Sequence, residues 1–275
     1  MKAPFRVVTD STADVPREWV DRYGIRVVPL KVLFGNTAFR DRVDLDDHEF
    51  LRRLEATQTL PSTSAPAAGE FADLYRVLAQ ECEAVISIHI GSELSGTVDA
   101  ARLGAELVPE VRVEVIDSHS VSMAVGFLCQ VAASASSTEE AMRLVQERIP
   151  KLRIIALLDT LRFLEMGGRI GRARAMLGAL LNLKPILGVR EGTVGPLDRV
   201  RTRSRGLERI LELLQEDEPV ERVAVMHARA PEEAQRLAAA VARAFPGAEV
   251  VTGQLGAVLT THTGPGAIGF AYVKG

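Results

Sequence analysis

Cysteine and aromatic residues are scarce in this sequence, and both shortages narrow the kinds of protein that it encodes. Only Cys82 and Cys129 occur among 275 residues, too few and too far apart for a disulfide framework or a paired metal-binding motif. Such cysteines are typical of buried free thiols in a reducing compartment. Aromatic residues make up 5% of the chain, with one tryptophan, which argues against the stacking platforms that bind single-stranded nucleic acids.

The sequence also lacks long apolar runs and a large net charge. Apolar residues make up 47% of the chain, enough for a sizeable core, but no run approaches the roughly 18 residues of a membrane span. The first residues, MKAPFRVVTD, contain no apolar signal-peptide segment. A formal net charge of −3 argues against a surface built for nucleic acid. We therefore expect a soluble, cytoplasmic protein without a nucleic-acid partner.

Short apolar runs alternate with amphipathic stretches in the first half of the chain. The runs, rich in Val and Ile, predict strands at residues 5–10, 25–34, 84–90 and 111–117. The intervening spacing predicts helices at residues 16–24, 69–81, 96–108, 122–135 and 138–149. This alternation predicts a largely parallel sheet covered by helices on both faces.

The second half has a more mixed pattern. It predicts strands at 152–159 and 221–228, helices at 171–181, 203–215 and 231–245, and a hairpin at 184–201 that turns at Glu191-Gly192. From residue 248 to the end, the pattern indicates short strands joined by glycine turns. We expect an α/β protein with two domains, residues 1–150 and 151–275, the second with a mixed sheet. The cleft between them is the expected place for a ligand.

Hydroxyl side chains gather where the predicted strands end. The loops at 9–14, 91–97 and 117–120 are rich in Ser, Thr and Asp, and each precedes a helix. Open parallel sheets bind ligands beyond the carboxyl ends of their strands. A further stretch, TLPSTSAPAAGEF at 59–71, places three consecutive hydroxyls between Pro61 and Pro66. Together these segments predict a binding site.

Ser95 and Gly96 stand at the predicted start of a helix, and two interpretations of them stay open. Helix N-termini attract anions through free N–H groups, and a glycine lets a ligand approach the backbone. Alternatively, Ser95 is a helix cap worth about 1 kcal/mol. The other hydroxyl-rich segments favour the binding interpretation.

The familiar catalytic motifs are missing. There is no G-x-S-x-G nucleophile elbow and no P-loop for ATP. GPGAIG at 264–269 matches a dinucleotide motif, but too little chain follows it for the required helix. DRVDLDDHEF at 41–50 lacks the spacing of a calcium loop, and we interpret it as a turn before a helix. His262, in the predicted loop TTHTGPG, is the histidine that we expect to contact a ligand.

Arginines concentrate in the second half of the chain. If the strand before residue 201 continued, alternation in RVRTRSR would place Arg199, Arg201, Arg203 and Arg205 on one face. Such a face is either solvated or a surface for an anion or an acidic partner, because guanidinium groups suit phosphate and carboxylate. Glycines around Arg169 indicate a tight backbone at that point.

Seven segments, in order, resemble one protein family across nearly the whole chain. They are VTDSTADVP, PSTSAPAAGEF, SELSGTVDAA, VIDSHSVSMAVG, LRFLEMGGRIGRA, LNLKPIL and THTGPGAIG. The sequence resembles the DegV family of bacterial fatty-acid-binding proteins, which serve as the acyl-carrying component of fatty acid kinase. The resemblance implies a two-domain DegV-like α/β fold that buries a long-chain fatty acid such as palmitate.

The resemblance also implies which residues meet the ligand. The fatty-acid carboxylate is expected to contact Thr63, Ser95 and His262. Four further positions that lie nearby in the family are matched by Ser64, Gly96, Thr97 and Ser118. An alanine at position 65 stands where the family commonly has a polar residue, so no side-chain contact is expected there.

A second set of residues is implied to form the surface for the partner and the phosphate. This set consists of Arg169 and Arg203, together with Arg172, Arg201 and Arg205. The expected protein is a carrier without a cofactor, whose bound carboxylate is phosphorylated by a separate ATP-dependent kinase. An acyltransferase downstream would use the acyl phosphate for phospholipid synthesis, and peripheral membrane contact would exchange lipid.

The physical chemistry agrees with a carrier. An acyl chain gains about 0.8 kcal/mol for each buried CH₂, and neutral donors from Thr63, Ser95 and His262 would satisfy the carboxylate without an enclosing arginine. Two rival functions remain. One is a serine-dependent hydrolase or acyltransferase that uses a loop hydroxyl with His262. The other is a regulator that binds DNA through its arginines, which the net charge disfavours.

Overall fold

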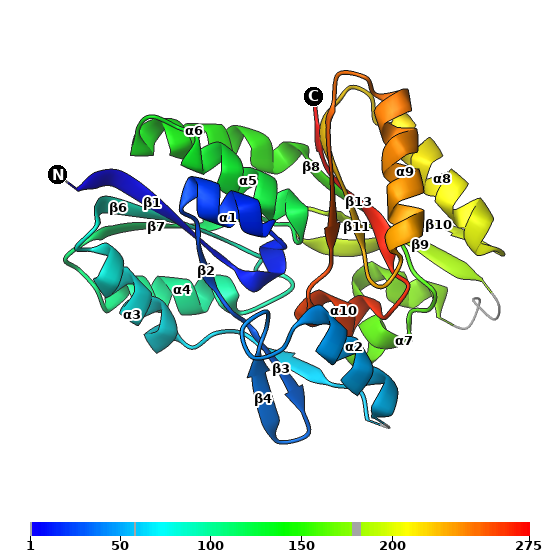
Figure 1. Ribbon diagram of the computed structural model, residues 1–275, viewed down its shortest axis with the longest axis horizontal. Coiled ribbons are helices and arrows are strands. Elements are labelled where there is room, and N and C mark those ends of the chain that lie inside the picture. The colour runs from blue at the N-terminus through cyan, green and yellow to red at the C-terminus, as the bar shows by residue number, and fades with distance from the viewer. Residues whose placement is uncertain (1, 58, 178–182) are drawn as a thin grey trace.

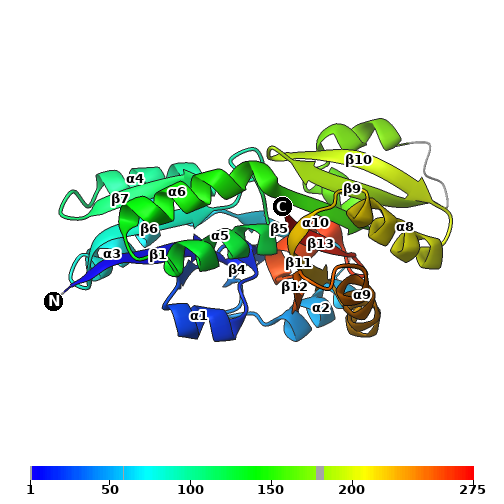
Figure 2. The same cartoon turned by 90° about the horizontal axis from the view of Figure 1, so that it is seen from above.

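A computed structural model describes residues 2–57, 59–177 and 183–275 of the chain. Its strands form sheets of four, six and three strands, and helices cover the two larger ones. Figures 1 and 2 show these two sheets lying end to end in an elongated molecule. The parallel sheet of the first half and the mixed sheet of the second confirm the predicted fold class.

The four-stranded sheet is parallel throughout, in the order β2-β1-β6-β7. Its strands are β1 (Ala3–Asp10), β2 (Arg26–Val28), β6 (Cys82–His89) and β7 (Arg112–Asp117). Buried Val and Ile side chains on both faces pack against helices, as parallel sheets require. The helices are α1 (Arg17–Tyr23), α5 (Met123–Ala133) and α6 (Thr138–Arg148) on one face, and α3 (Ala68–Leu78) and α4 (Thr97–Glu106) on the other (Figure 1). All five were predicted.

Helix α5 joins the two halves because it packs on both large sheets. It contacts β1 and β6 of the parallel sheet and β8, β11 and β13 of the mixed sheet. Phe127, Leu128 and Cys129 are fully buried, as expected for a helix that is apolar on nearly every side. One hydrophobic core therefore continues from the first half into the second. A domain boundary near residue 150 stays a proposal, based on the separate sheets of the two halves.

The strand predicted at 25–34 is two strands that belong to different sheets. After β2, the chain passes Pro29, which has no N–H to donate to a ladder, and continues as β3 (Lys31–Phe34). Strand β3 pairs antiparallel with β4 (Thr37–Arg40) and β5 (Ser62–Ser64). Helix α2 (Asp47–Ala56) follows β4, and Asp46 caps it by accepting a hydrogen bond from the Glu49 N–H.

The six-stranded sheet has the order β10-β9-β8-β13-β11-β12, with one parallel pair, β11 and β12. Its strands are β8 (Leu152–Leu157), β9 (Lys184–Arg190), β10 (Thr193–Val200), β11 (Val220–His227), β12 (Glu249–Gln254) and β13 (Ile268–Lys274). Helices α8 (Arg203–Gln215) and α9 (Pro231–Ala244) cover one face. The predicted hairpin is present, and both Glu191 and Gly192 have positive φ angles, as its tight turn requires.

Two predictions for the second half are wrong, and a third is confirmed only in part. The segment between β12 and β13 contains the helix α10 (Ala257–Thr263), so His262 lies in a helix and not in a loop. Strand β10 ends at Val200 and α8 begins at Arg203, so the four arginines do not share a strand face. The described part of the helix predicted at 171–181 is a 3₁₀ helix, Gly171–Met176, while 178–181 lie outside the described residues.

The remaining short elements are α7 (Arg162–Met166) and two further 3₁₀ turns, Ser11–Ala13 and Ile149–Lys151. Among the described residues, no helix combines the length and the apolar character that crossing a membrane needs.

Candidate functional site

A cavity lies between loops from the first half and the face of the six-stranded sheet opposite α8 and α9, where α5 covers only part of the sheet. It encloses about 1180 Å³ of empty space, its open mouth included. Apolar side chains from distant parts of the chain dominate its wall: Leu30, Ile90, Leu94, Val121, Leu158, Leu164, Leu187, Val194, Met226, Leu255, Val258, Leu259 and Phe270. A mostly apolar cavity with a few polar groups is the usual form of a small-molecule site.

The cavity reaches the middle of the six-stranded sheet. Ile154 and Ala156 lie in the central strand β8, and Val189 lies beside them in β9, yet all three are only half-buried. They line the cavity. Gly269 and Ala271, which pair with Ala156 and Ile154, also line it, and their small side chains leave space above the sheet. The apolar space therefore extends well below the surface.

Six polar side chains of the described residues line the cavity: Thr63, Ser95, Ser122, Arg169, His262 and Thr263. The Ser122 hydroxyl donates to Asp14 and the Thr263 hydroxyl donates to the Leu259 carbonyl. We call the other four, Thr63, Ser95, Arg169 and His262, the polar cluster. Strand β5 supplies Thr63, and the last turn of α10 supplies His262. The Thr63 hydroxyl Oγ1 and His262 Nε2 are hydrogen-bonded at 2.8 Å. The other ring nitrogen, Nδ1, is buried and has no partner among the described residues. The cluster thus joins residues that lie far apart in the sequence.

The His262 ring lies directly against the backbone of Gly167. A Cβ atom at position 167 would be 2.2 Å from His262 Nδ1, so only glycine fits there. Burial, and then the neighbouring Arg169 guanidinium, lower the pKa of His262 to about 4. The imidazole is therefore neutral near pH 7, and it acts there as a neutral hydrogen-bonding group.

Ser95 lies in the loop before α4, whose N-cap is Gly96. Its hydroxyl is hydrogen-bonded to the Thr97 hydroxyl at 2.8 Å, while Thr97 is buried behind it and does not line the cavity. Gly96 lines the cavity and is exposed, so the start of α4 faces the mouth. The N-cap lacks a side-chain hydrogen bond, so Ser95 does not serve as the cap of α4.

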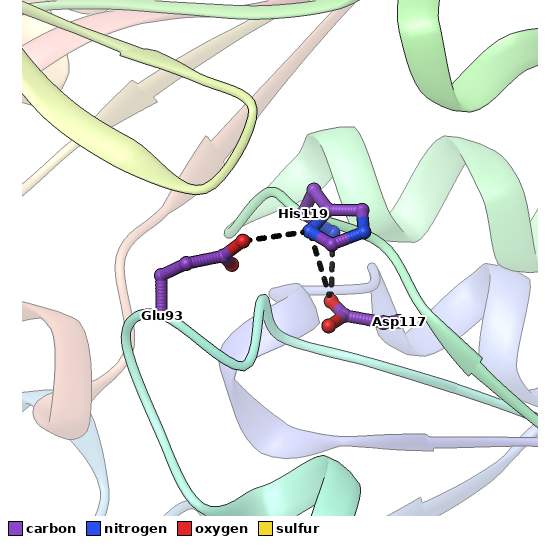
Figure 3. A group of neighbouring side chains, drawn as sticks. All are labelled: Glu93, Asp117 and His119. Carbon is purple, nitrogen blue, oxygen red and sulfur yellow. Dashed lines mark hydrogen bonds and ion pairs between the residues drawn. The ribbon is translucent and has the colours of Figure 1, made fainter.

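The loop that carries Ser95 is fastened by a group of three side chains, Glu93, Asp117 and His119 (Figure 3). Glu93 Oε1 lies 2.9 Å from His119 Nδ1, and Asp117 Oδ1 accepts hydrogen bonds from the Ser92 and His119 N–H groups. The carboxylate oxygens and the imidazole nitrogen that could bind a metal lie within 4.8 Å of one another. This set of ligand types also suits a divalent cation. Here these atoms bond to each other and to the loop backbone, so we assign them the role of holding the loop.

The tip of the β9–β10 hairpin docks on the same group. The Gly192 N–H donates to the His119 carbonyl at 2.7 Å, and a Cβ atom at position 192 would collide with the Glu93 carboxylate. Val189 and Val194 of this hairpin line the cavity. The second half therefore closes the cavity by resting on the Ser95 loop of the first half.

Arg169 lies at the mouth of the cavity, although the resemblance implied only a partner surface for it. Its Nε donates to the Leu94 carbonyl at 3.1 Å, and its Nη1 donates to the Gly167 carbonyl at 2.8 Å. It is exposed and also lines the cavity beside His262. A cation therefore stands next to the neutral donors, which the sequence had not led us to expect.

The structure separates the other predicted ligand residues from the cavity. Ser64 is exposed on β5, next to Thr63, and does not line the cavity. Ser118 is buried, and its hydroxyl both donates to the Ser120 carbonyl and accepts from the Ser120 N–H. Of the seven predicted ligand residues, four line the cavity: Thr63, Ser95, Gly96 and His262.

The other predicted arginines lie outside the cavity. Arg203 is half-buried and pairs with Glu233 and Asp159. Arg205 pairs with Glu208 and Glu212 along α8. Arg172 and Arg201 are exposed, and within the described residues neither makes an ion pair.

Comparison with known proteins identifies the family of this chain. A family model described as "Uncharacterised protein, DegV family" matches residues 4–275. Protein DegV of Bacillus subtilis is 36% identical, over 97% of this chain and 98% of the relative. A Thermus thermophilus structure, described as fatty acid binding of a DegV family protein, is 34% identical with a TM-score of 0.92, over 98% of this chain and 99% of that one.

The description of a further solved structure names the ligand that its protein binds. That protein is a stearic-acid-binding protein from Eubacterium ventriosum, 25% identical with a TM-score of 0.91, and each chain covers 98% of the other. The matching model spans almost the whole sequence, and the fold agrees from end to end. The chain therefore belongs to the DegV family.

Proposed function

We propose that this protein binds one long-chain fatty acid, such as palmitate, with the acyl chain in the cavity and the carboxylate at the polar cluster. The observation that carries the proposal is that the cavity wall has a large apolar part and a small polar part. Most of the wall is apolar, whereas Thr63, Ser95, Arg169 and His262 line one region beside the exposed Gly96, which we take as the mouth. Such an arrangement suits an amphipathic molecule with a single polar end.

The acyl chain would supply most of the affinity. Each CH₂ group that leaves water for the apolar cavity contributes about 0.8 kcal/mol. The solved structures described as binding fatty acids, from Thermus thermophilus and Eubacterium ventriosum, support the same ligand class here.

The carboxylate would take its hydrogen bonds from the Thr63 and Ser95 hydroxyls and from the neutral His262. Hydrogen bonds to a charged group contribute more than those between neutral groups, about 1.5–3 kcal/mol each. Arg169 would add a cation at the solvent side. This arrangement leaves the carboxylate near the surface, where a second protein can reach it.

We further propose that the bound carboxylate is presented to a separate ATP-dependent kinase, and that an acyltransferase uses the resulting acyl phosphate. The exposed Arg169 at the mouth, together with Arg172 and Arg201, supports a surface that receives the kinase and a phosphate. Arg203 and Arg205 would contribute less, because carboxylates of their own chain already neutralise them. Peripheral contact with a membrane would serve lipid exchange.

Lipid extraction tests the fatty-acid proposal directly. The purified protein is denatured and extracted, and the extract is analysed by mass spectrometry, before and after incubation with palmitate. The proposal expects about one fatty acid per chain. Absence of lipid from both samples would reject it. Acyl phosphate formation, after addition of a fatty acid kinase and ATP, tests the presentation step separately.

A hydrolase or acyltransferase is the second candidate, because Thr63 and His262 form a hydroxyl–imidazole pair. An activated hydroxyl needs a third group that orients the imidazole, usually a carboxylate at the other ring nitrogen. His262 Nδ1 has no partner among the described residues, so this pair lacks such a group. Labelling by a fluorophosphonate probe, lost in Thr63→Ala, would favour the enzyme over the carrier.

A second hydroxyl–imidazole–carboxylate chain lies inside the protein. Ser87 Oγ is 2.7 Å from His89 Nε2, and His89 Nδ1 is 3.0 Å from Asp10 Oδ2. All three side chains are buried, and the Ser87 hydroxyl is also bonded to the Tyr75 hydroxyl. Neither Ser87 nor His89 lines the cavity, so this network satisfies buried polar groups and has no access to a substrate.

A further inference from the structure

Helix α10, which carries His262, has no N-terminal cap of its own. Its N-cap residue is Gly256, which has no side chain to accept a hydrogen bond. Two carboxylates from the first half take this role. Asp14 Oδ1 accepts from the Gly256 N–H at 3.0 Å, and Asp41 Oδ1 accepts from the Ala257 N–H at 3.1 Å. The start of α10 is thereby bonded to residues more than 200 positions away in the sequence.

The Asp14 carboxylate has further partners, whereas the second oxygen of Asp41, Oδ2, is buried without a hydrogen-bond partner among the described residues. Asp14 is buried, and it accepts further hydrogen bonds from the Ser122 hydroxyl at 2.7 Å and from Arg42 Nη2 at 2.9 Å. The same Arg42 nitrogen donates to the Gln254 carbonyl at 2.8 Å, at the end of β12 just before α10. Asp41 is also buried, next to Arg42 in the sequence. Asp14, Asp41 and Arg42 together therefore form hydrogen bonds both to the start of α10 and to the end of β12, the strand that precedes it.

The backbone at this contact is unusual in a way that fits a positioning role. Asp14 and Arg42 have φ angles of 51° and 59°, in the left-handed region that costs non-glycine residues energy. At position 256, a Cβ atom would be 3.0 Å from Arg42 Nε and 3.2 Å from Asp41 Oδ2. Glycine allows this close approach of the side chains to the start of α10.

We propose that Asp14 and Asp41 are positioning residues for fatty-acid binding, which hold α10 so that His262 meets Thr63 at the mouth of the cavity. The inference rests on the proposed function. Helix α10 supplies Val258, Leu259, His262 and Thr263 to the cavity wall, and β5 of the first half supplies Thr63. A shift at the start of α10 would therefore move the wall of the cavity and the polar cluster together.

The raised pKa values at this contact predict a pH dependence that a purely packing role would not produce. Burial raises the pKa of Asp14 to about 7, against the opposing effects of Arg42, Ser122 and Gly256. Burial likewise raises the pKa of Asp41 to about 6, and it raises the pKa of Asp47. The charged groups that face one another here are Asp14, Asp41, Asp47 and Arg42. As the pH falls through 7, Asp14 takes up a proton. Its carboxyl group then accepts the hydrogen bonds from Arg42 and Gly256 without a negative charge, which weakens them.

The test compares Asp14→Asn and Asp14→Ala with the wild type. Asparagine keeps an acceptor for the Gly256 N–H but loses the charge, whereas alanine loses both. The measurements are the dissociation constant for palmitate, the ¹⁵N chemical shifts of the His262 ring without lipid, and the thermal unfolding curve. Asp21→Asn is the matched control, because Asp21 forms an exposed pair with Arg17 on α1 and does not line the cavity.

We expect Asp14→Ala to weaken palmitate binding by at least about tenfold, Asp14→Asn to weaken it by roughly threefold to fivefold, and Asp21→Asn to leave it unchanged. The His262 shifts should move in both Asp14 variants. Palmitate binding by the wild type should weaken as the pH falls from about 8 to 6, and Asp14→Asn should flatten this dependence.

Folded Asp14 variants with the affinity, pH dependence and His262 shifts of the wild type would overturn the proposal. If Asp14→Ala fails to fold, Asp14→Asn and Gly256→Ala decide it, because Gly256→Ala displaces the same contact by bulk. If the wild type binds no palmitate, the proposed function fails, and the lipid-free His262 shifts still decide whether Asp14 positions that residue.

Discussion

The Thr63 hydroxyl lies 2.8 Å from the Nε2 atom of His262, although 199 positions separate the two residues in the sequence. The contact joins β5 of the first half to α10 of the second, directly beside Gly167 and Arg169. Because most of the cavity wall is apolar, this contact marks the place where a ligand's polar end is expected.

Removing the hydroxyls tests whether they bind the head group. The double variant Thr63→Ala, Ser95→Ala should weaken palmitate binding by roughly 10- to 100-fold, since two hydrogen bonds to a carboxylate are lost. Isothermal titration calorimetry measures the change. Ser64→Ala is the matched control, because Ser64 lies next to Thr63 on β5 but is exposed and outside the cavity. Equal affinity of the double variant and the control would place the carboxylate elsewhere.

The lowered pKa of the buried His262 should make the protein less stable at acid pH. The pKa of His262 is lowered to about 4 in the folded protein, so the unfolded state binds more protons between pH 4 and 6.5. The free energy of unfolding therefore loses a contribution of roughly 2–3 kcal/mol as the pH falls through this range. Asp14 and Asp41 act in the opposite direction, so the comparison must be with His262→Gln. Urea unfolding at several pH values should show a smaller acid loss in the variant, and parallel curves would contradict the assignment.

A methyl group at position 167 should displace His262 without removing any polar atom. The Cβ atom of Gly167→Ala would lie 2.2 Å from His262 Nδ1, so the ring must move and the bond to Thr63 should break. We expect palmitate binding to weaken by about tenfold and the protein to lose about 1–3 kcal/mol of stability. Gly69→Ala in α3 is the control, because nothing lies within 4 Å of its Cβ position. Unchanged binding in Gly167→Ala would show that the ring position does not matter.

Filling the floor of the cavity should shorten the acyl chains that fit. Ala156 lies in the central strand β8 and is half-buried because the cavity reaches it. We expect Ala156→Phe to lose binding of stearate and palmitate while decanoate still binds. Competition among the three acids against one fluorescent fatty acid gives the ratio of their affinities. An equal loss for all three would mean that the mouth, and not the depth, has changed.

Much of the fold could be predicted from local patterns. In the first half, the Val- and Ile-rich runs and the helical spacing predicted the strands β1, β6 and β7 and the helices around them, because neighbouring residues determine them. The run at 25–34 is the exception, since it is divided between two sheets at Pro29. Helix α10 was missed for a physical reason. It is short and rich in Thr, which has a low helix propensity, and its cap comes from Asp14 and Asp41 of the other half. No local pattern records such a partner.

The site could be predicted only in part. Hydroxyls at strand ends indicated a binding region, and the resemblance to the DegV family selected Thr63, Ser95 and His262, which all line the cavity. The apolar wall was invisible in the sequence, because Ile154 and Val189 look like ordinary core residues. Likewise, Ser118 satisfies its own loop, and a motif match alone does not reveal this.

A crystal structure with bound palmitate tests the central claim most directly. The account predicts one carboxylate oxygen at about 3 Å from the Thr63 hydroxyl, near Ser95 and His262, and the acyl chain running inward past Ala156. Palmitate in the reverse direction, with its carboxylate deep beside Met226 and Ala271, or bound outside the cavity, would contradict it.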